Sequence, residues 1–395
     1  NQTNQTMNLN CRLRTSVIPQ PGALLTINKT IKDILVPDLS SYELVTSINK
    51  QFSNWKQEIS NPVFIGHNTI EFDENLLDYS LFTNLLNPYI TRPNRGDTLN
   101  LARGLYAVNP SAIKVGTSNR GKPVFKLPAL AKLNNLPVES AHDALSDVRS
   151  TIALAKFIFD NDYDTWKQME LTMKAGDAEE FINKRKGFTY VCFQSGNVRV
   201  EALSMVCETR YSKWYHTIKL ENDPQPLLEA NFEEFKKLIK KPRAKNRWLI
   251  CNKNPILFSG KLANNYEPYN NLGSELLNQR AEMIFKNKSL AEKFKHMEID
   301  RQLEKDEEAS QDNIFPETKA SDFINFTSSE KAIFQQFHQQ TSWDEKYKTS
   351  LQLKNPKASF IAKRLIFDES PETLSEDDFR SVHQELHDRL VVNQD

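Results

Sequence analysis

Apolar and polar residues alternate along the first part of the chain in a pattern typical of mixed α/β structure. An apolar run predicts a short buried strand at 63–66, followed by a turn around Asn68 and a helix from about 73 through 79. A second helix is predicted downstream by apolar residues at helical spacing, which we expect to anchor it on a core: Leu145, Val148, Ile152, Ala155 and Phe159. Short strands that alternate with helices predict an α/β layer fold for residues 1–160.

The pattern changes twice further along the chain. Between about 163 and 305, strands are predicted at 187–193, 198–206, 214–220 and 247–251, with helical segments between them. From about 306 a polar, acidic linker leads into a region of helical periodicity, with an apolar set of Phe323, Phe326, Ile333, Phe334 and Phe337. We therefore divide the chain into residues 1–160, 163–305 and 306–395.

The composition agrees with this division and indicates the cellular compartment. A chain of 395 residues with 39% hydrophobic content can bury more than one core. No apolar run approaches the roughly 18 residues that cross a membrane, and no signal peptide is visible. The cysteines Cys11, Cys192, Cys207 and Cys251 are scattered without a Cys-x-x-Cys pair, so we expect a reducing, cytoplasmic setting.

The main chemical candidates are a histidine and two carboxylates. His142 and Asp147 lie five residues apart where a helix is expected to begin, with Ser140 as its cap and Asp143 as a capping-box partner. This pairing suits metal-dependent phosphodiester chemistry, although a capped surface helix would explain the segment taken alone. Asp73 falls at the predicted strand-to-helix junction, where such folds place metal ligands. Capping of the helix would explain an aspartate at this position equally well.

Basic and aromatic residues supply further candidates. A cluster of Lys and Arg residues follows an amphipathic segment and ends at Trp248. It consists of Lys236, Lys237, Lys240, Lys241, Arg243, Lys245 and Arg247. These side chains could pair with phosphates or form a solvated face. We expect core positions, rather than base-stacking roles, for Trp166, Trp214, Tyr215 and Trp248. His67 is expected to pack or hydrogen-bond within the turn beside Asn68.

A set of short segments resembles a known family. These are Ile-Pro-Gln-Pro-Gly at 18–22, Phe-Asp-Glu at 72–74 with Asn-Pro-Tyr at 87–89, Phe-Lys-Leu at 125–127, Ser-Ala-His-Asp-Ala at 140–144 and Cys-Asn-Lys-Asn-Pro-Ile-Leu at 251–257. Together they resemble the DEDD-type 3′-to-5′ exonucleases with a histidine in the last motif, and within them the bacterial exodeoxyribonuclease I family. The resemblance implies a ribonuclease H-like α/β exonuclease domain, then an SH3-like barrel domain, then a C-terminal helical domain.

The resemblance also implies a mechanism. Asp73 and Asp147 would bind two Mg²⁺ ions, for which Mn²⁺ can substitute, together with an Asp-x-Glu pair on the first strand of the family. His142 would take a proton from the attacking water. Lys126 would steady the DNA backbone, and Asn68 would orient the turn that carries Asp73.

The chain departs from the family at its beginning. Nothing before Ile18 supplies the Asp-x-Glu pair, and the pairs at 177–179 and 306–308 lie in polar surroundings. We therefore expect a fragment that lacks an N-terminal segment of about 35 to 40 residues, including the first strand of the family, and that ends inside the helical domain. Such a chain would be inactive by itself even if the full protein is an enzyme.

Several functions are compatible with these residues. The first is a monomeric, Mg²⁺-dependent 3′-to-5′ exonuclease that acts on single-stranded DNA in repair and recombination and is recruited by the acidic tail of single-strand-binding protein. The second is a related nuclease that acts on RNA or in proofreading. The third is a noncatalytic nucleic-acid or protein-binding module. A metal phosphohydrolase that uses His142 and Asp143 as adjacent ligands is a remote fourth.

Overall fold

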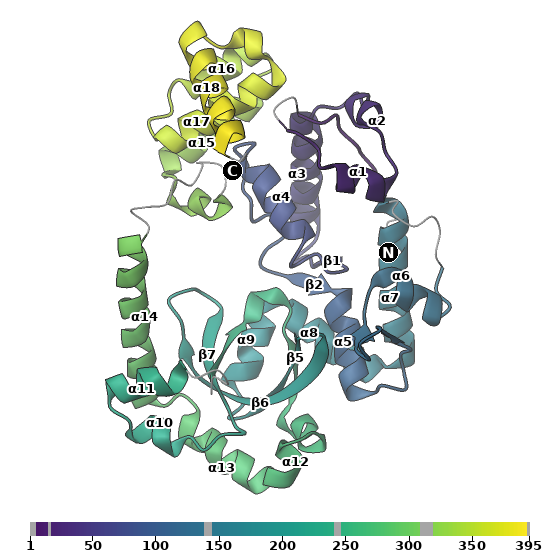
Figure 1. Cartoon of the computed structure of the whole chain (residues 1–395), viewed down its shortest axis with the longest axis vertical. Coiled ribbons are helices and arrows are strands. Elements are labelled where there is room, and N and C mark those ends of the chain that lie inside the picture. Colours follow the sequence, from purple (N-terminus) through teal and green to yellow (C-terminus); the bar gives the residue numbers. More distant parts are fainter. Residues whose placement is uncertain (1–4, 15–16, 138–143, 241–245, 309–318, 393–395) are drawn as a thin grey trace. The chain divides into compact units, whose positions relative to one another are not determined.

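A computed structural model describes residues 5–14, 17–137, 144–240, 246–308 and 319–392 (Figure 1). The chain forms two compact units. The first unit comprises Asn1–Ser60, Phe72–Ile90 and Asn313–Asp395, and the second comprises Asn61–Glu71 and Thr91–Asp312. Each unit therefore draws on segments that are far apart in the sequence.

The first unit is helical in its described part. Its early helices are α1 (Pro21–Ile27), α2 (Ile31–Leu35), α3 (Ser41–Glu58) and α4 (Asp73–Phe82). The C-terminal part adds η5 (Ala320–Asn325), α15 (Ser328–Gln339), α16 (Trp343–Ser350), α17 (Pro356–Glu369), η6 (Pro371–Thr373) and α18 (Glu376–Val392). One core joins the two parts, because Tyr42 and Phe82 pack with Phe326, Phe334 and Phe337. The predicted helical periodicity around residues 323–337 is thereby confirmed.

The second unit begins with a small parallel sheet and a group of helices. Strand β1 (Phe64–Gly66) pairs with β2 (Arg95–Asp97), which leads directly into α5 (Thr98–Val108). Strands β3 (Gly116–Thr117) and β4 (Pro123–Val124) form a short antiparallel pair before α6 (Leu127–Leu133). The helices α7 (Ala144–Asn161), α8 (Tyr163–Met173) and α9 (Ala175–Asn183) follow. The predicted strand at 63–66 and the predicted helix start at Asp73 are confirmed.

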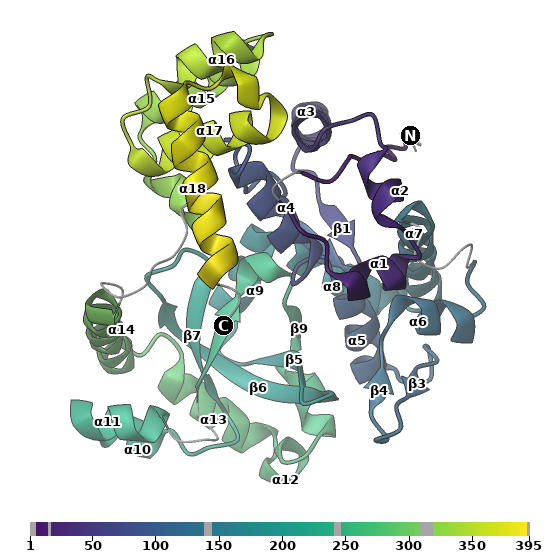
Figure 2. The ribbon, with the colours of Figure 1, turned by 45° about the horizontal axis from the view of Figure 1, so that its top comes forward.

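The rest of the second unit is built on a curved, five-stranded antiparallel sheet of order β8-β7-β6-β5-β9 (Figure 2). Its strands are β5 (Phe188–Gln194), β6 (Asn197–Glu208), β7 (Trp214–Lys219), β8 (Asn246–Ile250) and β9 (Ile256–Ser259). The first four match the strands predicted from the sequence. Around the sheet lie α10 (Gln225–Glu229), α11 (Phe232–Ile239), η1 (Cys251–Lys253), η2 (Gly260–Asn265), α12 (Tyr269–Leu272), α13 (Ser274–Ile284) and α14 (Lys288–Glu308).

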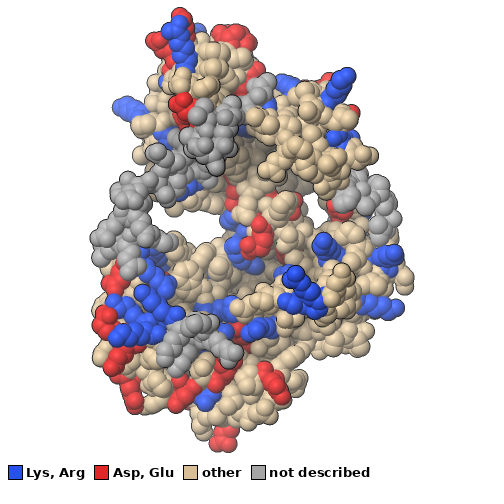
Figure 3. Space-filling view, viewed as in Figure 1, with Lys and Arg blue, Asp and Glu red and all other residues tan. Residues whose placement is uncertain are grey.

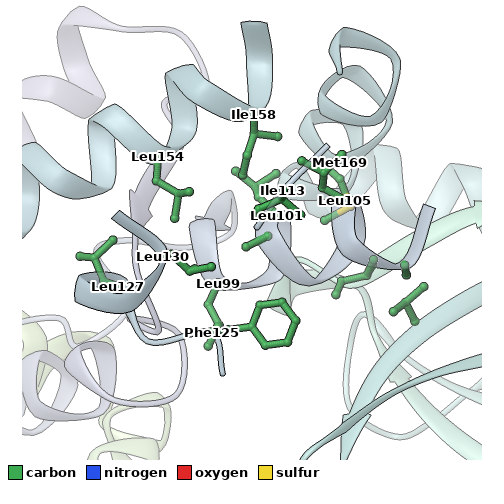
Figure 4. Close-up of a cluster of buried hydrophobic side chains, with 14 of the residues drawn as sticks. Leu99, Leu101, Leu105, Ile113, Phe125, Leu127, Leu130, Leu154, Ile158 and Met169 are labelled. Atoms are coloured by element: carbon green, nitrogen blue, oxygen red, sulfur yellow. The ribbon is translucent and has the colours of Figure 1, made fainter. Parts of the chain in front are cut away.

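Helix α7 packs through a different stripe from the one predicted. Its side chains at Leu154 and Ile158 are fully buried in a core with α5, α6 and α8 (Figure 4). By contrast Val148 is 53% exposed and Ile152 is 52% exposed. The prediction for this stripe was wrong because α7 carries apolar residues on two faces, and the small residues Ser146 and Ser150 let the other face approach its neighbours.

Two further observations bear on the sequence predictions. The helices of the described ranges include none that is both long and apolar enough to span a membrane. Trp248, which we expected in the core, is 42% exposed, whereas Tyr215 is buried as expected.

Candidate functional site

The turn after β1 has a tightly specified backbone. Asn68 adopts a left-handed conformation with φ of 62°, which asparagine tolerates better than most residues. A Cβ at Gly66 would lie 2.0 Å from Cγ2 of Thr69, so any larger residue there would collide with the turn. The turn predicted around Asn68 is therefore present, and its shape depends on residues on both sides.

Asp97, which the sequence reading missed, organises this turn. Its Oδ1 accepts the backbone N–H of Asn68 at 2.7 Å and that of Leu99 at 2.9 Å, and its Oδ2 accepts the backbone N–H of Ile70 at 3.4 Å. The backbone N–H of Asp97 itself donates to Oδ1 of Asn254 at 3.0 Å. Asp97 thus caps α5 and ties the Asn68 turn to the end of β2.

The carboxyl group of Asp97 is buried in this setting. Burial raises its pKa to about 6, although the backbone N–H groups and Arg103 oppose that rise. One sequence signal could have found this residue. An aspartate that follows a glycine and precedes an apolar helical repeat marks a strand end followed by a helix cap.

His67 connects the turn to the start of α6. Burial lowers its pKa to about 4, so the ring is neutral at pH 7. Because a carbonyl can only accept, Nε2–H donates to the carbonyl of Phe125 at 3.1 Å, and Nδ1 lies 2.9 Å from the hydroxyl of Thr98. The expectation that His67 hydrogen-bonds in the turn is confirmed. Lys126 follows Phe125 directly, with an exposed side chain at the N-cap of α6.

The two predicted metal ligands belong to different units. Asp73 is exposed and is the first residue of α4, in the first unit. Asp147 is exposed in the first turn of α7, in the second unit, together with Asn68 and Lys126. His142, like Ser140 and Asp143, lies outside the described residues.

No group of three or more His, Cys, Asp or Glu side chains that could hold a metal ion occurs within the described ranges. The exposed carboxylates of Asp73 and Asp147 nevertheless have the donor chemistry that Mg²⁺ prefers. Neither alternative Asp-x-Glu pair is on a strand, since one lies in α9 and the other in α14. In α9, Glu179 is already engaged by Lys213 and Tyr215.

The predicted basic patch is partly neutralised by its own neighbours. Lys236 pairs with Glu233 at 2.8 Å and with Asp300 at 3.2 Å. Arg247 binds the buried carboxylate of Glu201 through Nη2 at 2.7 Å. Residues 241–245 of the patch lie outside the described residues. Figure 3 shows Lys and Arg side chains gathered in the region of α11 and α14, with Asp and Glu side chains beside them.

The chain is similar to known nucleases. No family model matches it. Over 152 residues it is 32% identical to exodeoxyribonuclease I of Haemophilus influenzae, an alignment that covers 38% of the chain and 31% of that relative. The alignment thus spans about a third of the relative's length. Among solved structures, exonuclease I from Methylocaldum szegediense superposes with a TM-score of 0.78 at 20% identity, covering 96% of this chain and 81% of that one.

The fold is that of exonuclease I. The same fold is found in Escherichia coli exonuclease I bound to a dA16 oligonucleotide, with a TM-score of 0.74 at 17% identity, covering 96% of this chain and 82% of that one. A solved ExoI/SSB-Ct complex gives a TM-score of 0.74 at 18% identity, covering 96% of this chain and 81% of that one. The predicted resemblance to bacterial exodeoxyribonuclease I and the predicted fold class are confirmed.

Proposed function

We propose that the protein is a metal-dependent 3′-to-5′ exodeoxyribonuclease that releases 5′-mononucleotides from single-stranded DNA, in DNA repair and recombination. The observation that carries the proposal is the match to the exonuclease I fold over 96% of the chain. Sequence identity to the Haemophilus influenzae enzyme and the oligonucleotide bound to the Escherichia coli enzyme support the substrate class.

Asp73 and Asp147 are the residues of this chain that would hold the metal, as two Mg²⁺ ions with Mn²⁺ as a substitute. The metal supplies Lewis-acid stabilisation of the phosphate and lowers the pKa of water. His142 accepts the proton of the attacking water, a task suited to a neutral imidazole. The exposed Lys126 contacts the DNA backbone as a point charge.

The contacts around Asn68 support a positioning role for this residue. Its backbone is held by Asp97, and His67 beside it is bound to the carbonyl that precedes Lys126. Asn68 therefore orients the loop that leads to Asp73, and the same hydrogen bonds hold this loop close to Lys126. Asp97 and His67 act as positioning residues in this arrangement.

The proposal extends to organisation and partners. We propose a cytoplasmic monomer that is recruited by the acidic tail of single-strand-binding protein, supported by the complex of exonuclease I with an SSB-Ct segment. We also propose the division into residues 1–160, 163–305 and 306–395 as exonuclease, SH3-like barrel and helical domains. The curved sheet of β5 to β9 supports the middle assignment.

The test is Mg²⁺-dependent release of mononucleotides from 3′-labelled single-stranded DNA by the product of the complete gene. We expect Asp73→Asn, Asp147→Asn and His142→Ala each to lower release by at least a hundredfold. Asp164→Asn is the matched control, since Asp164 is also exposed in the first turn of a helix. Release from RNA alone would favour the related RNA exonuclease. DNA binding without release would favour the noncatalytic module.

A further inference from the structure

Three neighbouring aromatic rings come from the turn before β7, from the first residue of β7 and from the adjacent strand β8. Tyr211 lies 5.3 Å from Trp214, and Trp214 lies 5.9 Å from Trp248, measured between ring centroids. Tyr211 is 44% exposed, Trp248 is 42% exposed, and Trp214 is half-buried. We call these three residues the aromatic row. Exposed rings that gather in one place, as here, are typical of a binding surface.

The strand register explains why these rings share a face. Trp248 lies opposite His216 in the β7–β8 ladder, and Trp214 is two residues before His216 on the same strand. Side chains at positions i and i+2 of a strand point to the same side, so Trp214, His216 and Trp248 project from one face of the sheet. Tyr211 precedes β7 and joins the row through its ring contact with Trp214. The alternate residues Tyr215 and Leu249 are buried in the core on the opposite face.

The row is held in place before any ligand arrives. The backbone N–H of Trp214 donates to the carbonyl of Tyr211 at 3.1 Å, and the N–H of Tyr211 donates to the Thr209 hydroxyl at 3.0 Å. Beneath Trp248, the His216 ring stacks on Phe294 of α14 at 4.2 Å. His216 also bonds to Glu298 through Nε2 at 2.9 Å. Little conformational entropy is therefore lost when the row binds a partner.

Two guanidinium groups flank the row. Arg210 lies over the Tyr211 ring at 4.6 Å, and Arg301 of α14 lies over the Trp248 ring at 5.9 Å. Arg210 donates to the uncharged side chains of Gln302 and Tyr211. No ion pair between either guanidinium and a carboxylate occurs among the described side chains, so neither positive charge is neutralised there. The nearby carboxylate of Glu298 instead binds His216 and the backbone N–H of Arg210. The row thus combines exposed aromatic faces with available positive charge.

We propose that the aromatic row binds single-stranded DNA by stacking successive bases, with Arg210 and Arg301 contacting the phosphates. Every base has a π-face, so stacking of this kind holds a strand without reading its sequence. The row engages nucleotides other than the one being cleaved and thereby keeps the strand on the enzyme. The inference rests on the proposed function and adds a second region of the protein that contacts the DNA strand.

The test is equilibrium binding of oligo(dT) strands of increasing length, in EDTA, followed by fluorescence anisotropy. For strands long enough to reach the row, we expect Trp248→Ala to weaken binding about fivefold to a hundredfold. Trp248→Phe keeps a ring and retains most of the affinity. Tyr163→Ala is the matched control, because Tyr163 is 55% exposed in the same unit and belongs to a different ring contact, with Phe159, and it leaves binding unchanged. Binding of the shortest strands is the same for all four proteins.

The salt dependence of DNA binding distinguishes base stacking by the rings from phosphate contacts by the arginines. Trp248→Ala leaves the slope of log affinity against log salt unchanged, whereas Arg301→Gln reduces its magnitude by about 0.7, the value expected for one lost phosphate contact on a single strand. Tyr211→Ala repeats the test at the other end of the row, and thermal unfolding of each variant checks that it is folded.

The outcomes are distinguishable. If the wild-type protein neither binds nor degrades single-stranded DNA, the proposed function fails and the inference fails with it. If the wild type degrades DNA but folded Trp248→Ala and Tyr211→Ala bind long strands as Tyr163→Ala does, only the inference is overturned. It is also overturned if Trp248→Ala binds DNA normally and instead loses affinity for an acidic peptide.

Discussion

The carboxylate of Asp97 accepts the backbone N–H of Asn68 at 2.7 Å, across 29 residues of sequence. This bond joins the end of β2 to the turn after β1, and the same oxygen caps α5 through Leu99. One buried side chain therefore sets both the shape of the Asn68 turn and the start of the neighbouring helix. Through Asn68 this carboxylate is connected to the proposed nuclease site, and its protonation state can be tested.

Asp97 gives the protein a pH-dependent stability. Its pKa is raised to about 6 in the folded state from an ordinary value of 3.8, so the folded state holds the proton more tightly than the unfolded state. The contribution of Asp97 to unfolding free energy is therefore most favourable below pH 4 and falls as the pH rises to 6, by up to about 3 kcal/mol. Urea unfolding of the wild type and Asp97→Asn at pH 4 and pH 7 measures this difference. Parallel pH profiles for the two proteins would contradict it.

Tyr42 and His338 connect two distant parts of the first unit. The Tyr42 hydroxyl lies 2.9 Å from Nδ1 of His338, and burial lowers the histidine pKa to about 4. Since Nε2 faces the carbonyl of Leu85 at 3.4 Å, the neutral ring donates there and Nδ1 accepts from Tyr42. Tyr42→Phe would leave Nδ1 without its donor, and we expect it to lower the free energy of unfolding by about 1–3 kcal/mol.

The same histidine predicts acid sensitivity. A folded-state pKa below the ordinary 6.5 means that the stabilising contribution of neutral His338 is present above that pH and is lost as the pH falls to about 4. Nuclear magnetic resonance titration of the wild type should show the ring neutral at pH 5. In Tyr42→Phe the hydroxyl that donates to Nδ1 is gone, so the ring should protonate at a higher pH. An unchanged midpoint would show that the bond does not control the ring.

The sequence predicted the strands of the second unit well, for a physical reason. Segments such as 188–194 and 214–219 carry dense β-branched and aromatic residues, and this signal is local. It predicted less well which face an element buries. Trp248 follows the strand pattern, but its exposure depends on α14, which packs on the same face of the sheet some 50 residues later.

In the candidate site, too, local signals were predictable from the sequence and long-range contacts were not. Asn68 was recognisable as a turn residue and Asp73 as a helix start, because both signals are local. Asp97 was missed because its importance comes from hydrogen bonds to Asn68 and Ile70. Contacts of that range are fixed by the pairing of β1 with β2, which no short window of sequence contains.

Helix α7 allows the corrected packing to be tested directly. Leu154 is fully buried and Ile152 is 52% exposed, although the two are separated by a single residue. We expect Leu154→Ala to lower the free energy of unfolding by about 2–5 kcal/mol and Ile152→Ala to change it by less than about 0.5 kcal/mol. Denaturant unfolding of both variants provides the comparison. Equal losses would show that the stripe containing Ile152 is also covered.

The final prediction concerns metal binding by the chain. Asp147 is exposed in the first turn of α7, with a backbone carbonyl that accepts the Thr151 hydroxyl at 2.8 Å, so its position is set by the helix and its carboxylate faces solvent. If it is a ligand, Asp147→Ala removes one of the charges that hold a divalent cation, and we expect at least a tenfold loss of Mn²⁺ affinity by calorimetry. Asp164→Ala, which removes an equally exposed first-turn carboxylate from α8, serves as the control and should bind Mn²⁺ as the wild type does. Equal Mn²⁺ affinity in all three proteins would exclude Asp147 as a ligand and would leave the phosphodiester chemistry without one of its two assigned carboxylates.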